Sequence, residues 1–563
     1  MSALLTSGCA EPGSDPTESG DLADLVIWGG KIVTVDDTVP EAEALAVKGD
    51  RIVAVGTKAD VEAMVGESTE VVDLAGRLAI PGFVEAHAHY VSLGDAKIQL
   101  PLGSATSWAE IVDMVKKAAD ESEPGQWIRG RGWHQDKWSD APARLVDEFP
   151  THDELSAAAP DNPVLLTHAS GHALLANAKA MEAAGIDAST ADPPGGDIVR
   201  DASGAASGLF NETAQGLIHA ARGGGEGDVP ADELRRMIQL AGDECRSKGV
   251  TSFHDAGSPF PVIDALGAAA DAGELGTRLW VMAEGSNDDL AANLAAYKTT
   301  DRGNHHLAVG GIKRYMDGAL GSRGALLLAP YDDDPDTVGL QLSEIEDLRR
   351  TAELAKEHGY QLAVHAIGDK ANRQVLDLFA ETLTAEDGTR PDHRWRVEHA
   401  QHLDPADIPR FAELGVIASM QTVHCTSDGP WVPERLGDER SEAGAYVWQT
   451  LLESGALVIN GTDAPVEDVD PLANYYAAVT RRLKNGDTFY GDQSMTREQA
   501  LRSMTLDAAH GAFQEDKVGS LATGKLADVV VLSKDILTVP DEELPDARVD
   551  MTILGGEIVY RAP

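Results

Sequence analysis

Two histidines have the residue type and the spacing of metal ligands. His87 and His89 end an apolar run at residues 81–89 that is typical of a buried strand. Residues two apart on a strand point to the same side, so both imidazoles can reach one metal ion. For so short a motif, two strand-end histidines with ordinary hydrogen bonds are the alternative. Residues elsewhere in the chain must decide between the two interpretations.

Further polar residues occur in or just after other apolar runs. Lys313 lies within such a run, His365 and His399 each end one, and Asp463 follows one. Taken singly, they have structural explanations: a satisfied histidine, a lysine reaching the surface, or a helix N-cap. A barrel of parallel strands, however, builds its active site where the C-terminal ends of the strands meet. The set therefore predicts a ring of ligands for one or two divalent ions.

The elements that would position this ring are apolar strands alternating with amphipathic helices, which is typical of a parallel sheet. A closed (β/α)8 barrel needs eight strands, and the sequence offers nine. We assign the surplus strand to a subdomain inserted after strand 1, at about residues 94–236, because this connection is too long for a βα loop. The predicted strands are 83–87, 164–167 (in the insert), 251–254, 279–282, 311–315, 361–365, 394–399, 416–420 and 457–460.

The two ends of the chain share a different pattern, of short strands separated by tight turns. The predicted fold class is α/β: a distorted (β/α)8 TIM barrel with a small β-sandwich built from both chain ends and the insert after strand 1. The predicted parts are a tether at 1–21, a sandwich half at 22–80, the barrel at 81–510 and the second sandwich half at 511–563.

The composition excludes some classes of function. The 563 residues carry 46 Lys and Arg against 93 Asp and Glu, a formal net charge of −47. Binding to nucleic acid or to an anionic membrane surface needs clustered cations, so neither partner is expected. No run approaches the roughly 18 to 20 apolar residues of a spanning helix, so no integral membrane segment is expected. Adaptation to a saline habitat is one hypothesis for the acidic excess.

The three cysteines, Cys9, Cys245 and Cys425, have no spacing typical of a disulfide framework or a thiolate zinc site. Residues 5–9 resemble the end of a bacterial lipoprotein signal, followed by a polar tether, although a charged start is absent and the apolar stretch is very short. A lipid anchor at Cys9 with a cell-envelope location is one hypothesis, and a plain N-terminal tail on a cytoplasmic protein is the other.

Taken together, the motifs resemble those of the amidohydrolase superfamily, and closely its amidohydrolase family 3 branch, which includes N-substituted formamide deformylase-like proteins. The resemblance extends over essentially the whole chain from residue 22. Its motifs are Pro-Gly-Phe-Val-Glu-Ala-His-Ala-His at 81–89, Gly-Val-Thr-Ser-Phe-His-Asp-Ala-Gly at 249–257, Asp-Gly-Ala-Leu-Gly-Ser-Arg at 317–323, His-Ala-Ile-Gly-Asp at 365–369, Glu-His-Ala-Gln at 398–401 and Asp-Ala-Pro-Val at 463–466.

The resemblance implies a role for each ligand candidate. His87 and His89 hold a metal, and His365 and His399 serve the same ion or a second one. Lys313 matches a lysine that carbon dioxide can carbamylate to N6-carboxylysine, which bridges two metals. Asp463 matches the aspartate that binds or faces the metal and moves protons. Thr462 and Thr422 stand where serine and proline are expected, and neither change removes a ligand.

The implied activity is a metal-dependent hydrolase acting on a non-peptide C–N bond of a small molecule, such as an amide, an N-acyl or N-formyl group, or a cyclic amide. Histidine and carboxylate ligands favour zinc and leave manganese, iron and cobalt open. A deaminase or isomerase on the same scaffold is the alternative, and a catalytically silent, tethered binding protein is a third hypothesis. A homodimer is the expected assembly.

Five residues outside the ligand set lie in stretches that resemble the family's pocket and insert, and are predicted to bind substrate. For each of them a purely structural role is the alternative; for example, the first could simply pack the insert. They are Trp133, His172, Glu212, His254 and Arg323.

Overall fold

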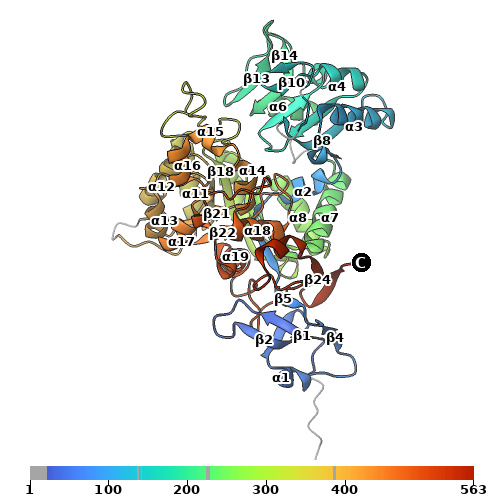
Figure 1. Cartoon of the computed structure of the whole chain (residues 1–563), viewed down its shortest axis with the longest axis vertical. Coiled ribbons are helices and arrows are strands. Elements are labelled where there is room, and N and C mark those ends of the chain that lie inside the picture. Colours follow the sequence, from blue (N-terminus) through green and yellow to red (C-terminus); the bar gives the residue numbers. More distant parts are fainter. Residues whose placement is uncertain (1–21, 136–137, 141, 224–228, 385–387) are drawn as a thin grey trace, which may run out of the picture.

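The computed structural model describes residues 22–135, 138–140, 142–223, 229–384 and 388–563. Its centre is a nearly closed barrel of eight parallel strands (Figure 1). Hydrogen bonds beyond the strand ends close the seam between the first and last strands: the Asp463 amide donates to His87 O at 2.8 Å. In chain order the strands are β6 (Phe83–Ala88), β15 (Val250–Ser258), β16 (Arg278–Ala283), β18 (Leu307–Tyr315), β19 (Gln361–Ala366), β20 (Arg396–His399), β21 (Ile417–Met420) and β22 (Val458–Asn460).

The barrel strands are parallel, and the helices that connect them cover their outer side, so the strands are buried on both faces. Every residue of β16 and of β19 is buried, as expected for strands that have side chains inside the barrel and helices outside it. The α/β barrel is therefore confirmed. The surplus strand lies in β11 of a separate sheet, as predicted.

The outer helices follow the 3.6-residue period. In α11 (Ile345–His358), Leu348, Thr351, Ala352 and Ala355 are buried on one face. The helix ends at Gly359, whose left-handed φ of 68° suits glycine at a helix C-terminus. The other helices after barrel strands are α2 (Tyr90–Ala96), α7 (Ala231–Ser247), α8 (Phe260–Asp271), α9 (Asn287–Tyr297), α12 (Asp369–Leu383), α13 (Ile408–Leu414), α14 (Thr422–Asp428), α15 (Val432–Leu436), α16 (Asp438–Gly444), α17 (Trp448–Glu453), α18 (Pro471–Thr480), α19 (Arg497–Ser503) and α20 (Leu506–Gly511).

Both ends of the chain contribute strands to one unit, as predicted; this unit is one mixed eight-stranded sheet, where a small β-sandwich was expected. The two halves join where β5 pairs antiparallel with β23, with Pro81 opposite Val529. Because β5 ends at Pro81 and β6 begins at Phe83, this sheet adjoins the N-terminal end of the barrel. Its strands are β1 (Leu25–Val33), β2 (Glu41–Lys48), β3 (Arg51–Gly56), β4 (Glu70–Asp73), β5 (Leu78–Pro81), β23 (Val529–Leu532), β24 (Val549–Leu554) and β25 (Glu557–Arg561).

A buried ion pair fastens the terminal sheet to the barrel. Arg278, the first residue of β16, donates from Nε and Nη2 to the two carboxylate oxygens of Asp528 at 2.8 and 2.9 Å. The side chains are only 5% and 3% exposed. Removing one partner of such a pair leaves an uncompensated buried charge, which makes this contact costly to break.

The insert is a six-stranded sheet with helices on both faces. Along β11, Val164 and Leu166 pack on the side of α3 and α4, and Leu165 packs on the side of α5 and α6. The elements of the insert are β7 (Leu100–Pro101), α3 (Trp108–Asp120), β8 (Ile128–Trp133), α4 (Asp153–Ala158), β11 (Val164–His168), β12 (Ala173–Ala176), α5 (Ala178–Ala183), β13 (Gly196–Arg200), β14 (Ala206–Glu212) and α6 (Gln215–Arg222). The predicted boundary near residue 236 falls inside α7, which packs into the barrel core through Leu234 and Met237.

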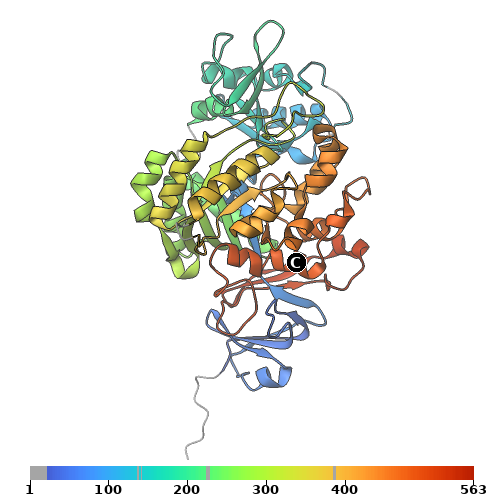
Figure 2. The ribbon, with the colours of Figure 1, turned by 90° about the vertical axis from the view of Figure 1, so that its left-hand side faces the viewer.

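The insert and the terminal sheet lie at opposite ends of the barrel. Both views show the insert at the top and the terminal sheet at the bottom (Figures 1 and 2). The insert thus covers the end of the barrel where the strands finish, which is the end that carries the predicted ligands.

The structure also bears on the predictions about the N-terminal tether, membrane segments and cysteines. Cys9 and the tether at 1–21 lie outside the described residues. Within the described ranges, no helix is both long enough and apolar enough to cross a membrane. Cys245 and Cys425 are buried and free.

Candidate metal centre

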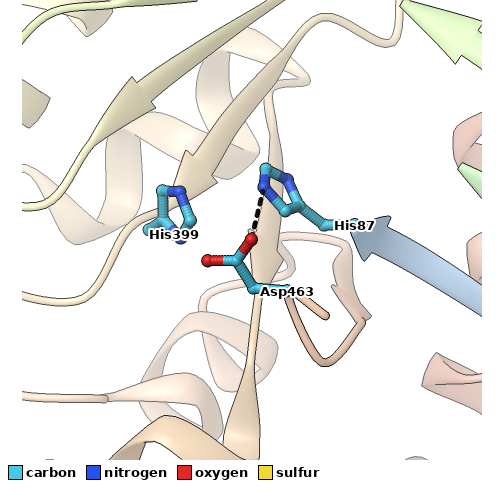
Figure 3. Close-up of side chains that lie close together, drawn as sticks. All are labelled: His87, His399 and Asp463. Carbon is cyan, nitrogen blue, oxygen red and sulfur yellow. Dashed lines mark ion pairs between the residues drawn. The ribbon is translucent and has the colours of Figure 1, made fainter. Parts of the chain in front are cut away.

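Three of the predicted ligands meet at the C-terminal end of the barrel. His87 lies in β6, His399 ends β20, and Asp463 follows β22. One ligand atom from each lies within 4.8 Å of the other two, and all three residues are buried (Figure 3). His87 thus meets two side chains that lie more than 300 residues away in the sequence, in an arrangement that suits a single ion.

The other three predicted ligands surround this group. His89 Nε2 lies 3.2 Å from Asp463 Oδ1. The ring centroid of His365 is 4.4 Å from that of His399. Lys313 Nζ lies 3.5 Å from His87 Nε2. The structure therefore brings all six residues together.

Left-handed backbone conformations aim two of these side chains. His399 has φ of 75° and the following Ala400 has φ of 45°, a region that residues with a Cβ seldom adopt. The kink breaks the strand alternation, so that Glu398 contacts His87 Nδ1 and the adjacent His399 ring also faces His87, with centroids 4.7 Å apart. Asp463 has φ of 58°. Strained backbone of this kind is concentrated at functional sites.

Hydrogen bonds from behind fix the orientation of two imidazoles. His87 Nδ1 contacts the Glu398 carboxylate, whose other oxygen forms an ion pair with Arg396, with Oε1 2.8 Å from Nε. His399 Nδ1 donates to Gln421 Oε1 at 2.7 Å. Because Nδ1 of each ring contacts a neighbouring side chain, Nε2 of each ring can bind an ion. A carboxylate or an amide behind a histidine ligand is the usual arrangement in metal sites.

The electrostatics hold the site in a form that can bind metal. Burial and the charge of Lys313 lower the pKa of His87 to about 4 against the opposing effect of Glu398, so the imidazole is neutral. Burial alone would raise the pKa of Asp463, but His89 at 3.2 Å and the neighbouring His87 and His399 hold it well below its usual range. Burial lowers the pKa of Lys313.

The unmet bonding capacity of the site fits a divalent ion. Among the described residues, His365 Nε2 and Asp463 Oδ1 are buried without a hydrogen-bond partner. A buried polar atom left in this state costs about 1–3 kcal/mol. Imidazole nitrogens and a carboxylate oxygen are the ligand types of zinc and related metals, so the residues present suit such an ion.

The profile of the amidohydrolase family matches residues 70–560 of this chain. The chain belongs to the amidohydrolase family. Protein LONG AFTER FAR-RED 3 of Arabidopsis thaliana is 33% identical over 96% of this amidohydrolase and 92% of its own length. The putative amidohydrolase YtcJ of Bacillus subtilis is 33% identical over 95% and 99%. The N-substituted formamide deformylase of Arthrobacter pascens is 27% identical over 96% and 98%.

A solved structure agrees with this assignment. An uncharacterized metal-dependent hydrolase from Pyrococcus horikoshii superposes with a TM-score of 0.75 at 28% identity, over 92% of this amidohydrolase and 99% of that chain. Family and fold together make this protein a metal-dependent hydrolase of the amidohydrolase family.

Two of the predicted substrate-binding residues reach the metal centre of the amidohydrolase from the insert. His172 lies in the turn between β11 and β12, and its ring centroid is 6.2 Å from that of His365. Its Nδ1 lies 2.9 Å from Oε2 of Glu212, which ends β14 with a left-handed φ of 49°. The pair therefore faces the predicted ligands.

The structure does not bring the other three predicted residues to the centre. Trp133 is buried in the core of the insert, where its Nε1 donates to Leu166 O at 3.0 Å. His254 lies inside the barrel with its Nδ1 3.2 Å from Arg396 and its ring against Trp280. Arg323 pairs with Asp333 at 2.8 Å. For these three residues, substrate binding stays a prediction.

Several residues that orient the predicted ligands were not predicted from the sequence. Glu398 and Arg396 adjoin His399, and only the kink in β20 directs Glu398 to His87. Glu85 precedes His87 by two residues, a strand spacing that was an available signal, and it accepts from Thr462 N at 2.7 Å. Asp317 accepts backbone N–H groups of Leu326, Ile367 and Gly368, and burial raises its pKa to about 7.

Proposed function

We propose that this amidohydrolase hydrolyses a C–N bond other than a peptide bond in a small molecule: an amide, an N-acyl or N-formyl group, or a cyclic amide. One or two divalent ions, of which zinc best suits the ligand set, would be held by His87, His89, His365, His399 and Asp463. The convergence of three buried ligand atoms within 4.8 Å at the C-terminal end of the barrel carries this proposal. Membership of the amidohydrolase family supports it.

The chemistry divides between the ion and the protein. A bound divalent ion supplies hydroxide near neutral pH and polarises the carbonyl of the scissile bond. Asp463 is ionised, so its carboxylate can accept the proton of the attacking water and deliver it to the leaving nitrogen. His87 and His399 are held as neutral imidazoles with fixed orientation by Glu398 and Gln421.

Lys313 determines the charge of the site. As an ammonium group 3.5 Å from His87 Nε2 it would repel a divalent ion. We propose that the ammonium group first loses one proton and that the resulting amine combines with carbon dioxide and releases a second proton, which together convert a cation into a carboxylate ligand. Protein equilibrated with 13C-bicarbonate should show a carbamate carbon resonance that is absent in Lys313→Met. The absence of that resonance in the metal-loaded wild type would exclude the modification.

The experiment combines metal analysis with a substrate panel. Purified protein is assayed for bound metals, and the panel of N-formyl, N-acyl and cyclic amides is followed by amine and carboxylate release, with and without chelator. The proposal expects bound divalent metal and chelator-sensitive amide hydrolysis. Ammonia release from aminated heterocycles alone would identify a deaminase, and a product of unchanged mass an isomerase. Metal-free protein without turnover would favour a binding protein.

A further inference from the structure

Two side chains at the centre are partly exposed, whereas the others are not. The side chains of His87, Lys313, His365 and His399 are almost fully buried, whereas those of His89 and His172 are 28% and 23% exposed. His89 follows β6 and His172 belongs to the insert. The exposed side chains therefore lie where the barrel meets the insert, and a substrate that enters here would contact the residues that line this entrance.

Arg131 of the insert lies at this entrance. It is a half-buried residue of β8, and its Nε donates to Pro465 O at 3.3 Å, two residues beyond Asp463. Within the described ranges, no carboxylate lies within ion-pair distance of its guanidinium. Arg129 on the same strand differs, because it pairs with Asp95 at 2.5 Å and with Glu233 at 2.8 Å. The terminal nitrogens of Arg131 are thus available to a ligand.

His172 is adjacent to Arg131. A Cβ atom built on Gly171 would lie 3.7 Å from Arg131 Nη2, so the guanidinium borders the residue that precedes His172. The Nδ1 of His172 is committed to Glu212, and its Nε2 has no protein partner in the part of the chain that the structure describes. The guanidinium of Arg131 therefore borders the turn that carries His172.

We propose that Arg131, beside the turn that carries His172, binds a carboxylate group of the substrate, which makes the substrate class an N-acylated, carboxylate-bearing small molecule. The proposal rests on the proposed amide hydrolysis and adds the substrate's charge to it. A guanidinium binds a planar carboxylate with two parallel hydrogen bonds, a geometry that a lysine cannot reproduce. Because Arg131 contacts the segment that follows Asp463, the carboxylate would lie close to the scissile amide.

The competing explanation is structural. Arg131 could only tie the insert to the Pro465 segment through its Nε hydrogen bond. In that case the loss of Arg131 would affect all substrates equally. A carboxylate site instead discriminates between two substrates that differ in charge alone.

The test uses matched pairs: N-formyl-, N-acetyl- and N-benzoylglycine, and the corresponding glycinamides. The wild type should prefer the acids. Arg131→Met should lower kcat/KM for the acids by about 10–100-fold, the range for losing a hydrogen bond to a charged group, and leave the glycinamides within about threefold. Arg131→Lys should restore only part of the loss. Arg144→Met is the matched control, since Arg144 is an exposed cation of the insert paired with Asp153 and Asp201.

Calorimetric binding separates this proposal from the proposed function. Titration of N-benzoylglycine and N-benzoylglycinamide into wild type and Arg131→Met, as purified and after chelation, reports the carboxylate site without turnover or a metal–carboxylate bond. Acid binding that weakens in Arg131→Met upholds the carboxylate site even if no amide in the panel is hydrolysed. Equal binding of acid and amide, no binding of either, or equal losses for both in the variant would overturn it.

Discussion

Replacing Glu398 with glutamine tests the orientation of the metal centre. Glu398 is fully buried and contacts His87 Nδ1 with one oxygen and Arg396 Nε with the other. Burial would raise its pKa, but Arg396 and His87 hold it far below the usual range, so the native group is a carboxylate. Glutamine keeps the shape and removes the charge. The substitution should therefore affect both metal binding and stability.

The two effects have separate magnitudes. Losing the group behind a histidine ligand weakens metal binding about 10–100-fold, which is about 1.4–2.8 kcal/mol. Leaving the buried Arg396 without its carboxylate costs about 3–5 kcal/mol of stability. Metal affinity is measured by competition with a chromophoric chelator at fixed pH. Melting temperature is measured on chelated protein, so that lost metal binding does not contribute to the stability change.

Asp528→Asn is the matched control. It breaks the buried pair with Arg278, which lies where the terminal sheet meets the start of β16, at the other end of the barrel. This variant should lose a similar amount of stability while its metal affinity stays within about twofold of the wild type. The reasoning is refuted if Glu398→Gln binds metal as tightly as the wild type, or if Asp528→Asn loses as much affinity as Glu398→Gln does.

Three further outcomes are expected. Asp463→Asn should lower kcat by about 10²–10⁴-fold, the range for a lost proton-transfer group, while most of the metal is retained; activity near that of the wild type would exclude the proton-transfer role. Burial raises the pKa of Asp428 from 3.8 to about 6, so its contribution to stability is present below pH 4 and is lost as pH rises through 6. Asp428→Asn should flatten the melting temperature over this pH range, and an unchanged pH profile would contradict the assignment. The net charge of −47 predicts that melting temperature rises between low and molar salt, because salt screens the repulsion, and a flat response would count against a saline adaptation.

The sequence was sufficient to locate the barrel strands and the six predicted metal ligands. All eight predicted barrel strands overlap observed ones, because a strand buried on both faces needs a continuous apolar run, which is a local property. The ligand candidates could be found for a similar reason. In a barrel, the C-terminal ends of strands share one face, so residues such as His365 and Asp463 could be assigned to that face from their position in a run alone.

Substrate-facing residues were harder to predict. His172 and Glu212 reach the centre, but Trp133 does not, although all three lie in the insert. The insert packs helices on both faces of its sheet, so an aromatic residue there is as well suited to that core as to a pocket. Only the position of the insert over the barrel decides whether such a residue packs in the core of the insert or faces the centre.

The sequence by itself therefore determined the fold class, the order of the strands and the identities of the six residues at the centre, because these follow from runs of neighbouring side chains. The tertiary structure decided which atoms meet. Thr462 donates to Glu85 across 377 residues, and Arg131 reaches Pro465 across 334. Such contacts depend on the packing of the whole chain and on left-handed kinks such as that at His399, and no local pattern encodes them.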